Sequence, residues 1–182
     1  KKKKNHNQEE EDVTAACAEA ANGDVVAAVN FNAPGQVVIA GAAGAVERAI
    51  EACKARGARK AMPLPVSVPS HCALMKGAAE ELATALDEVT FNDAVIPVVQ
   101  NVTASVAQDS ESLKANLVKQ LYSPVLWTDT VRKLVANDVR IAVECGAGKV
   151  LAGLAKRIDR ELSVYGIDEP DALAKASEAF GQ

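Results

Sequence analysis

Apolar positions in the first third of the chain alternate between a helical spacing and short continuous runs. Apolar residues recur every three or four positions from Val13 to Ala20, which is typical of one buried face of a helix. Two apolar, β-branched runs then flank a turn at residues 32–36, which predicts a hairpin. Together the pattern predicts helix, strand, strand, helix and strand, at residues 9–22, 25–31, 37–40, 46–57 and 64–68.

This order is that of a ferredoxin-like, split β-α-β unit whose first strand is missing. The missing strand should precede residue 9, but residues 1–8 are polar and charged and have no apolar side chain to bury. We interpret residues 1–8 as an atypical segment: a tag, a cloning remnant, a disordered end or a misassigned stretch. A basic tail that binds an anionic partner is the alternative, and His6 belongs to this segment.

Beyond residue 69, helical patterns alternate with buried, β-branched runs. This alternation predicts a parallel sheet covered by helices on both faces. The fold class is therefore α/β, with a small subdomain at 9–68 and a larger one at 69–182. The expected strands are 94–102, 139–145 and 164–167, and the expected helices are 73–87, 109–122, 128–136, 150–162 and 170–180.

Composition and charge narrow the class of protein. Hydrophobic residues make up 49% of the 182 residues and the formal net charge is −4, so we expect a folded core and no nucleic-acid partner. We find no apolar run long enough to span a bilayer and no secretory signal, and the four cysteines form no C-x-x-C pair. We therefore expect a cytoplasmic protein with reduced thiols and no membrane contact.

One histidine lies where α/β proteins usually assemble a site. His71 follows the strand expected at 64–68 and precedes the helix expected from Ala73. A histidine there can exchange protons near neutral pH, although a histidine that opens a helix is more often a capping or packing residue. A metal site is not expected, because no second usable histidine, carboxylate or thiol recurs at ligand spacing.

Three other motifs have weaker claims on function. Residues 146–149 read Gly-Ala-Gly-Lys, but Val150 stands where a phosphate-binding loop needs a hydroxyl, so a tight turn is the better interpretation. Cys72 is interpreted as a small buried thiol rather than a nucleophile. No serine has the flanking glycines of a nucleophile elbow, so the group that a basic His71 would serve is not in this chain.

Several separated motifs, in order, closely resemble bacterial malonyl-CoA:acyl carrier protein transacylases. They read NFNAPGQVVIAG at 30–41, PLPVSVPSHCALM at 63–75, QLYSPVLW at 120–127 and ECGAGKVL at 144–151. The family more often has proline at the position of Ala147. The resemblance runs from about residue 13 to the C-terminus and implies a ferredoxin-like subdomain plus part of an α/β-hydrolase-like one.

The resemblance also implies an activity and a set of residues. The family transfers malonyl from coenzyme A to acyl carrier protein through a malonyl-serine intermediate, in fatty acid biosynthesis and without a cofactor. Its catalytic histidine falls on His71, its orienting main-chain carbonyl falls on Gln120, and Asn30 and Asn32 lie in a cleft-facing segment with a weak substrate-side role. Because the carbonyl is main-chain, we expect substitution of Gln120 to matter little.

The part of the family that carries the serine, the malonyl-binding arginine and the oxyanion-hole glutamine has no counterpart here. We therefore expect the chain alone to be inactive. Another possibility is that the sequence is incomplete and the real molecule carries the missing part. We expect the complete protein to be a monomer. The alternative is a ferredoxin-like module that binds a ligand or a carrier protein without catalysis.

Overall fold

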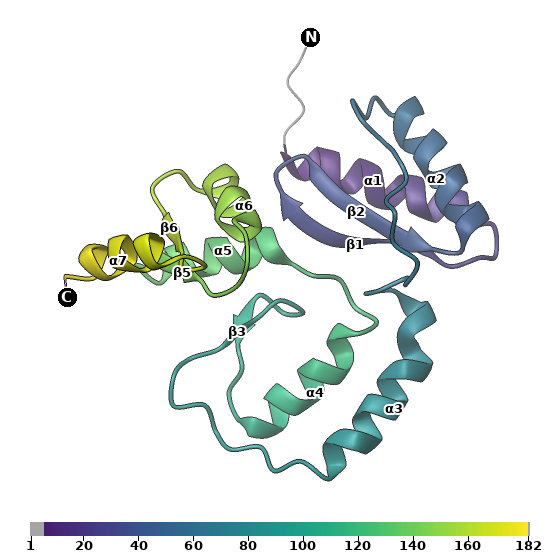
Figure 1. Cartoon of the computed structure of the whole chain (residues 1–182). Helices are drawn as coiled ribbons and strands as arrows, with labels where there is room; N and C mark the ends of the chain where they lie inside the picture. Colours follow the sequence, from purple (N-terminus) through teal and green to yellow (C-terminus); the bar gives the residue numbers. More distant parts are fainter. Residues whose placement is uncertain (1–5, 182) are drawn as a thin grey trace.

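A computed structural model of the chain describes residues 6–181, and its first unit is a hairpin covered by two helices (Figure 1). Helix α1 (His6–Ala21) leads into β1 (Val26–Ala33), and the turn at Pro34 and Gly35 returns the chain as β2 (Gln36–Gly41). The strands are antiparallel, as the sequence predicts, and α2 (Ala43–Ala55) completes the unit.

Small side chains let this unit pack closely. Its core joins α1, β1 and α2 through five buried residues: Cys17, Ala20, Val26, Ala45 and Ala49. A Cβ atom at Gly41 would lie 2.0 Å from the carbonyl oxygen of Val25, so the crossing from β2 to α2 requires glycine. Arg48 fastens α2 to the end of α1, donating from Nε to the carbonyl of Ala20 at 2.9 Å.

The second unit, drawn below the hairpin in Figure 1, contains two helices and a short pair of strands. A 3₁₀ turn (Ala73–Met75) leads into α3 (Lys76–Asp87), and the short antiparallel strands β3 (Val99–Gln100) and β4 (Ser105–Val106) precede α4 (Ser110–Gln120). Lys114 on α4 forms an ion pair with Asp87 on α3 at 2.9 Å. Asp109 caps α4, since its carboxylate accepts from the amide of Ser112 at 2.7 Å.

The third unit is a β-α-β crossover. Helix α5 (Trp127–Ala136) leads to β5 (Ile141–Glu144), and α6 (Val150–Ile158) connects it to β6 (Ser163–Gly166), which pairs with β5 in parallel. Helix α7 (Pro170–Ala179) closes the chain. The parallel arrangement expected for the second half is thus present in these two strands, over a core of Val131, Ala155 and Leu162.

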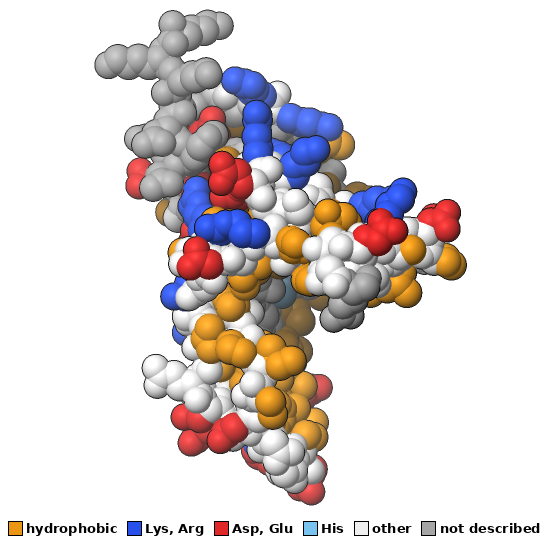
Figure 2. All heavy atoms as spheres, turned by 90° about the vertical axis from the view of Figure 1, so that its left-hand side faces the viewer, with side chains coloured by type: hydrophobic (Ala, Val, Ile, Leu, Met, Phe, Trp, Pro, Cys, Tyr) orange, Lys and Arg blue, Asp and Glu red, His pale blue; other side chains and the backbone are white. Residues whose placement is uncertain are grey.

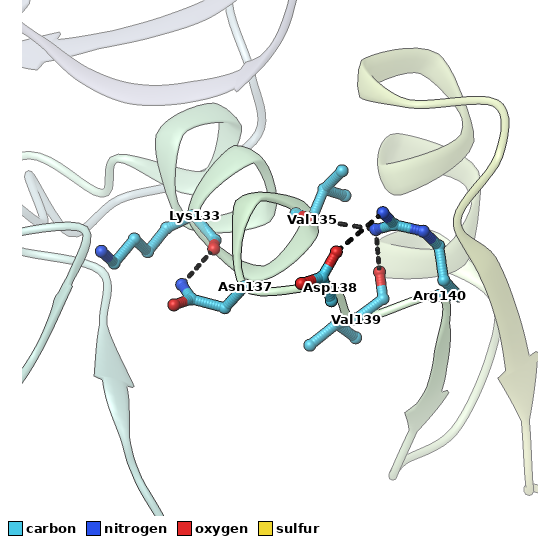
Figure 3. Close-up of polar contacts among 6 residues, drawn as sticks. All are labelled: Lys133, Val135, Asn137, Asp138, Val139 and Arg140. Carbon is cyan, nitrogen blue, oxygen red and sulfur yellow. Dashed lines mark hydrogen bonds and ion pairs between the residues drawn. The ribbon is translucent and has the colours of Figure 1, made fainter.

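The turn that ends α5 is held by its own polar groups (Figure 3). Arg140 donates from Nη1 to the carbonyl of Val135 at 3.0 Å and from Nη2 to Asp138 at 3.2 Å. Asn137 donates to the carbonyl of Lys133 at 2.6 Å. These bonds satisfy carbonyls at the helix C-terminus and direct the chain from α5 into β5.

Two strands expected from the sequence are wrong. Residues 64–68 form no strand, and Val66 is 69% exposed. Within 94–102 only Val99–Gln100 is a strand, while Val95 is 98% exposed. Their apolar composition predicts burial, but a strand also needs a neighbour for its hydrogen bonds. Among the described residues no strand pairs with 64–68, and β4 pairs with Val99–Gln100 alone in the second segment.

The N-terminal helix is longer than expected. It begins at His6 rather than at residue 9, so the tail expected at 1–8 is partly helical, and residues 1–5 lie outside the described residues. Elsewhere the expected helices and the strands of the hairpin and the crossover are present, with ends that differ by a few residues. Over residues 6–181 no helix is long and apolar enough to cross a membrane.

Candidate functional site

His71 is held by two consecutive carbonyls at the C-terminal end of α4. Its Nδ1 lies 2.8 Å from the carbonyl oxygen of Gln120, and its amide donates to the carbonyl of Leu121 at 2.9 Å. A carbonyl oxygen only accepts, so the first contact requires a proton on Nδ1 and leaves Nε2 as the acceptor in the neutral ring. Nε2 has no hydrogen-bond partner among the described residues.

The sequence after α4 explains why both carbonyls are available. In a continuing helix the carbonyl of Gln120 would accept from residue 124, but that residue is Pro124, which has no N–H. The carbonyl of Leu121 would accept from Val125, whose amide instead donates to Val29 on β1 at 2.8 Å. The carbonyl oxygens of Gln120 and Leu121, which have no partner within the helix, are therefore available to His71.

The backbone of His71 is itself unusual. Its φ angle is +65°, a left-handed conformation that is uncommon for residues other than glycine and clusters at functional sites. The bond from its amide to Leu121 opposes the relaxation of this angle. His71 precedes the 3₁₀ turn as expected, with Cys72 as the intervening cap residue.

The side chain of Gln120 also takes part in the structure, which the sequence analysis missed. Its Nε2 donates to the carbonyl of Ser123 at 3.0 Å and to that of Pro124 at 3.2 Å. The available signal was the Ser123-Pro124 pair, which marks a turn that carbonyl-binding side chains can stabilise.

Asn30 is joined to the histidine site through the backbone. It forms a parallel bridge with Val125, which brings β1 beside the segment that follows α4. The amide of Phe31 donates to Val125 at 3.0 Å, and Thr128 donates to the carbonyl of Phe31 at 3.0 Å. Asn32 is half-buried on the same strand, but over the part of the chain described no recorded contact joins it to His71 or Gln120.

The thiol and the glycine-rich loop have structural partners. Cys72 is buried and its Sγ donates to the carbonyl of Pro69 at 3.2 Å, which confirms the interpretation of a small buried thiol. At the 146–149 loop, the Glu144 carboxylate accepts from the amides of Leu151 and Ala152 at 2.9 and 2.8 Å, and Asp168 accepts from Gly148. Carboxylates of the chain itself thus occupy this helix N-terminus, which agrees with a tight turn rather than a phosphate loop.

A basic cavity lies where α6 meets the hairpin turn. Arg157 donates to the side chain of Gln36 and to the carbonyl of Pro34, which fastens the third unit to the first. The cavity has a volume of about 640 Å³ and is lined by Pro34, Gly153, Lys156, Arg157 and Arg160. Among residues 6–181, no group of three histidine, cysteine or carboxylate side chains could hold a metal ion.

The fold and a histidine oriented by a carbonyl define a candidate acid–base centre on an α/β scaffold, and comparison with known proteins identifies the class. The family model described as "Acyl transferase domain" matches residues 2–163 of the chain. The chain therefore belongs to the acyl transferase domain family.

Within this family, the similar proteins are malonyl transacylases. The chain is 54% identical over 166 residues to the malonyl CoA-acyl carrier protein transacylase of Escherichia coli K12, covering 91% of the chain and 54% of that protein. The crystal structure of an acyl carrier protein S-malonyltransferase from Vibrio cholerae superposes with a TM-score of 0.90 at 52% identity, covering 91% of this chain and 54% of that one.

A third similar structure contains a carrier protein. It is a malonyl-transacylase in complex with a type II PKS acyl-carrier protein, with a TM-score of 0.90 at 50% identity, covering 93% of this chain and 55% of that one. The chain thus spans about half the length of the relatives that it matches.

Proposed function

We propose that this chain is the portion of a malonyl-CoA:acyl carrier protein transacylase that supplies the general acid and base. The observation that carries this proposal is the 2.8 Å contact between Nδ1 of His71 and the carbonyl of Gln120, which leaves Nε2 free to take a proton. The 54% identity to the Escherichia coli transacylase names the reaction that such a base would serve.

The proposed chemistry uses Nε2 twice. In the first half-reaction Nε2 takes the proton of a serine hydroxyl as its oxygen attacks the malonyl thioester, and returns it to the departing thiolate of coenzyme A. In the second half-reaction Nε2 takes the proton of the carrier's phosphopantetheine thiol, which attacks the malonyl-serine ester. The serine oxygen leaves with that proton. The Gln120 carbonyl stabilises the transient imidazolium, as a carboxylate does in a Ser-His-Asp triad.

The serine is proposed to come from a segment outside this sequence. Among the described residues no serine side chain hydrogen-bonds with His71, and no serine has the context of a nucleophile elbow. We propose the same origin for the arginine that pairs with the malonyl carboxylate, because the resemblance assigns it to the part of the family that has no counterpart in this sequence. The chain alone is therefore proposed to be unable to form a malonyl-enzyme.

Substrate contacts are proposed on the hairpin side of the site. Asn30 lies beside the segment that follows α4, through its bridge to Val125, and both it and Asn32 are half-buried polar residues on β1. The basic cavity at α6 offers Lys156, Arg157 and Arg160 to the phosphate groups that coenzyme A and phosphopantetheine share.

A chimaera tests the proposal. The matched portion of the Escherichia coli transacylase would be replaced by this chain, and transfer of labelled malonyl from coenzyme A to acyl carrier protein would be measured. We expect transfer by the chimaera and a fall of about 10²–10⁴-fold in His71→Ala, the usual contribution of a general base. His6→Ala, which removes the other histidine, is the matched control and should leave transfer unchanged.

The isolated chain is the second arm of this experiment. Intact mass after incubation with malonyl-CoA should show no added malonyl group. An adduct on these 182 residues, or full transfer by the His71→Ala chimaera, would contradict the proposal.

A further inference from the structure

The Gln120 side chain and the Gln120 carbonyl act in different places. The carbonyl contacts His71, whereas the side-chain Nε2 reaches forward to the carbonyls of Ser123 and Pro124. These two bonds fold the four residues after α4 back onto its last turn. They therefore fix the peptide planes from which the acceptors of His71 project.

Backbone hydrogen bonds hold this turn only weakly. The two amides that follow α4, those of Leu121 and Tyr122, make bonds of 3.2 and 3.3 Å to carbonyls three residues earlier, which are at the long end of the usual range, and Pro124 contributes no amide. The next firm anchor is Val125, which pairs with β1. Between these points the Gln120 side chain is the group that ties the turn to the helix.

We propose that the Gln120 side chain is a positioning residue for His71, and this inference rests on the proposed role of His71 as the base. By holding the Ser123–Pro124 turn, the amide keeps the carbonyls of Gln120 and Leu121 aimed at Nδ1 and at the amide of His71. Loss of the amide lets the turn move, and the ring then exchanges between its two tautomers. The form with the proton on Nε2 cannot accept the proton of a nucleophile. Under this proposal, and in contrast to the expectation from sequence, substitution of Gln120 has a measurable effect on His71.

The test reads the tautomer of His71 directly. The chain would carry His6→Ala, so that ¹⁵N-histidine labelling reports on His71 alone, and nitrogen chemical shifts would be measured with the ring neutral. In this background we expect one tautomer, with the proton on Nδ1. Gln120→Glu, which keeps the length but loses the donor, and Gln120→Met, which adds no charge, should each raise the Nε2–H to Nδ1–H ratio about fivefold, the factor for one net hydrogen bond.

Gln108→Glu is the matched control, because Gln108 is an exposed glutamine just before α4 and the same charge is introduced. It should leave the tautomer unchanged. If Gln120→Glu does not fold, Gln120→Met decides. A lower thermal midpoint with an unchanged tautomer in both Gln120 variants, or an equal change in Gln108→Glu, would overturn the proposal. The measurement needs no acyl transfer, so its outcome is separate from that of the chimaera assay.

Discussion

Pro124 stands four residues after Gln120, at the position whose N–H would otherwise close the last turn of α4 onto the Gln120 carbonyl. That carbonyl instead lies 2.8 Å from Nδ1 of His71, 49 residues earlier in the chain. A residue without a donor thus leaves an acceptor free for a distant side chain. The geometry of the candidate base depends on where α4 stops.

Pro124→Ala is expected to redirect this carbonyl. The substitution restores a donor at position 124 and removes the bias of proline against a helical residue before it, so the new amide competes with His71 for the carbonyl. We expect the new amide at position 124 to exchange its hydrogen more slowly than an amide exposed to solvent, and we expect a second tautomer of His71 in the NMR spectrum. Pro97→Ala, which changes an exposed proline outside α4 and outside the site, is the control. Free exchange at position 124 together with one tautomer would contradict this account.

Acid should weaken the other end of α4. Hydrogen bonds from the side chain and then the backbone of Ser112 hold the pKa of Asp109 below its ordinary value of 3.8. The folded state therefore favours the carboxylate, and the stabilisation is present above pH 3.8 and is lost as the pH falls through the lower folded pKa. Asp109→Asn keeps a good cap without a titrating charge, so the thermal midpoint should depend less steeply on pH in that window. An identical pH dependence of parent and variant would show that protonation of Asp109 does not change the stability of the fold.

The hairpin, the crossover and the helices follow from local patterns, because each of these elements finds its neighbour within the described chain. The segments 64–68 and 94–98 have the same apolar character, yet Val66 and Val95 are exposed. An apolar sequence pattern indicates that burial of a segment would be favourable, but it does not show whether other residues are present to cover that segment.

The candidate site also has some features that the sequence predicts and others that it does not. The local pattern places His71 just before an expected helix, and the resemblance implies that the main-chain carbonyl of Gln120 orients it. The left-handed φ of His71 accompanies contacts to Gln120 and Leu121 over about 50 residues of sequence, which no local pattern shows. The bonds of the Gln120 side chain are local, to Ser123 and Pro124, but the turn signal alone does not say which side chain makes them.

The buried thiols should differ from the exposed one in reactivity. Burial, and secondarily the neighbouring Cys53, raises the pKa of Cys17 from 9.0 to about 11. Because the thiolate is the reactive form, iodoacetamide at pH 9 should modify exposed Cys145 first and Cys17 far more slowly, as peptide mass spectrometry would show. The raised pKa also means that this thiol stabilises the fold up to pH 9 and progressively less from there to pH 11. Modification of Cys17 as fast as Cys145 would contradict its burial.

The exposed apolar residues give the last prediction. Figure 2 shows hydrophobic side chains gathered over the lower part of the molecule, which contains α3, α4 and the segment before β3. An exposed apolar patch favours association, so the chain should self-associate as its concentration rises and bind an apolar dye.

Substitutions in this patch and in the core should have opposite effects on association and on stability. Ile96 is 77% exposed, so Ile96→Lys should change the free energy of unfolding by less than about 0.5 kcal/mol while reducing association in sedimentation experiments. Val29 is 2% exposed, and Val29→Ala should instead cost about 2 kcal/mol and leave association unchanged at low temperature. Val95→Lys provides a second test of the patch, since its side chain is 98% exposed. If Ile96→Lys and Val95→Lys destabilise the chain as much as Val29→Ala, the segment is buried in solution, and the layer that covers it must come from another copy of the chain.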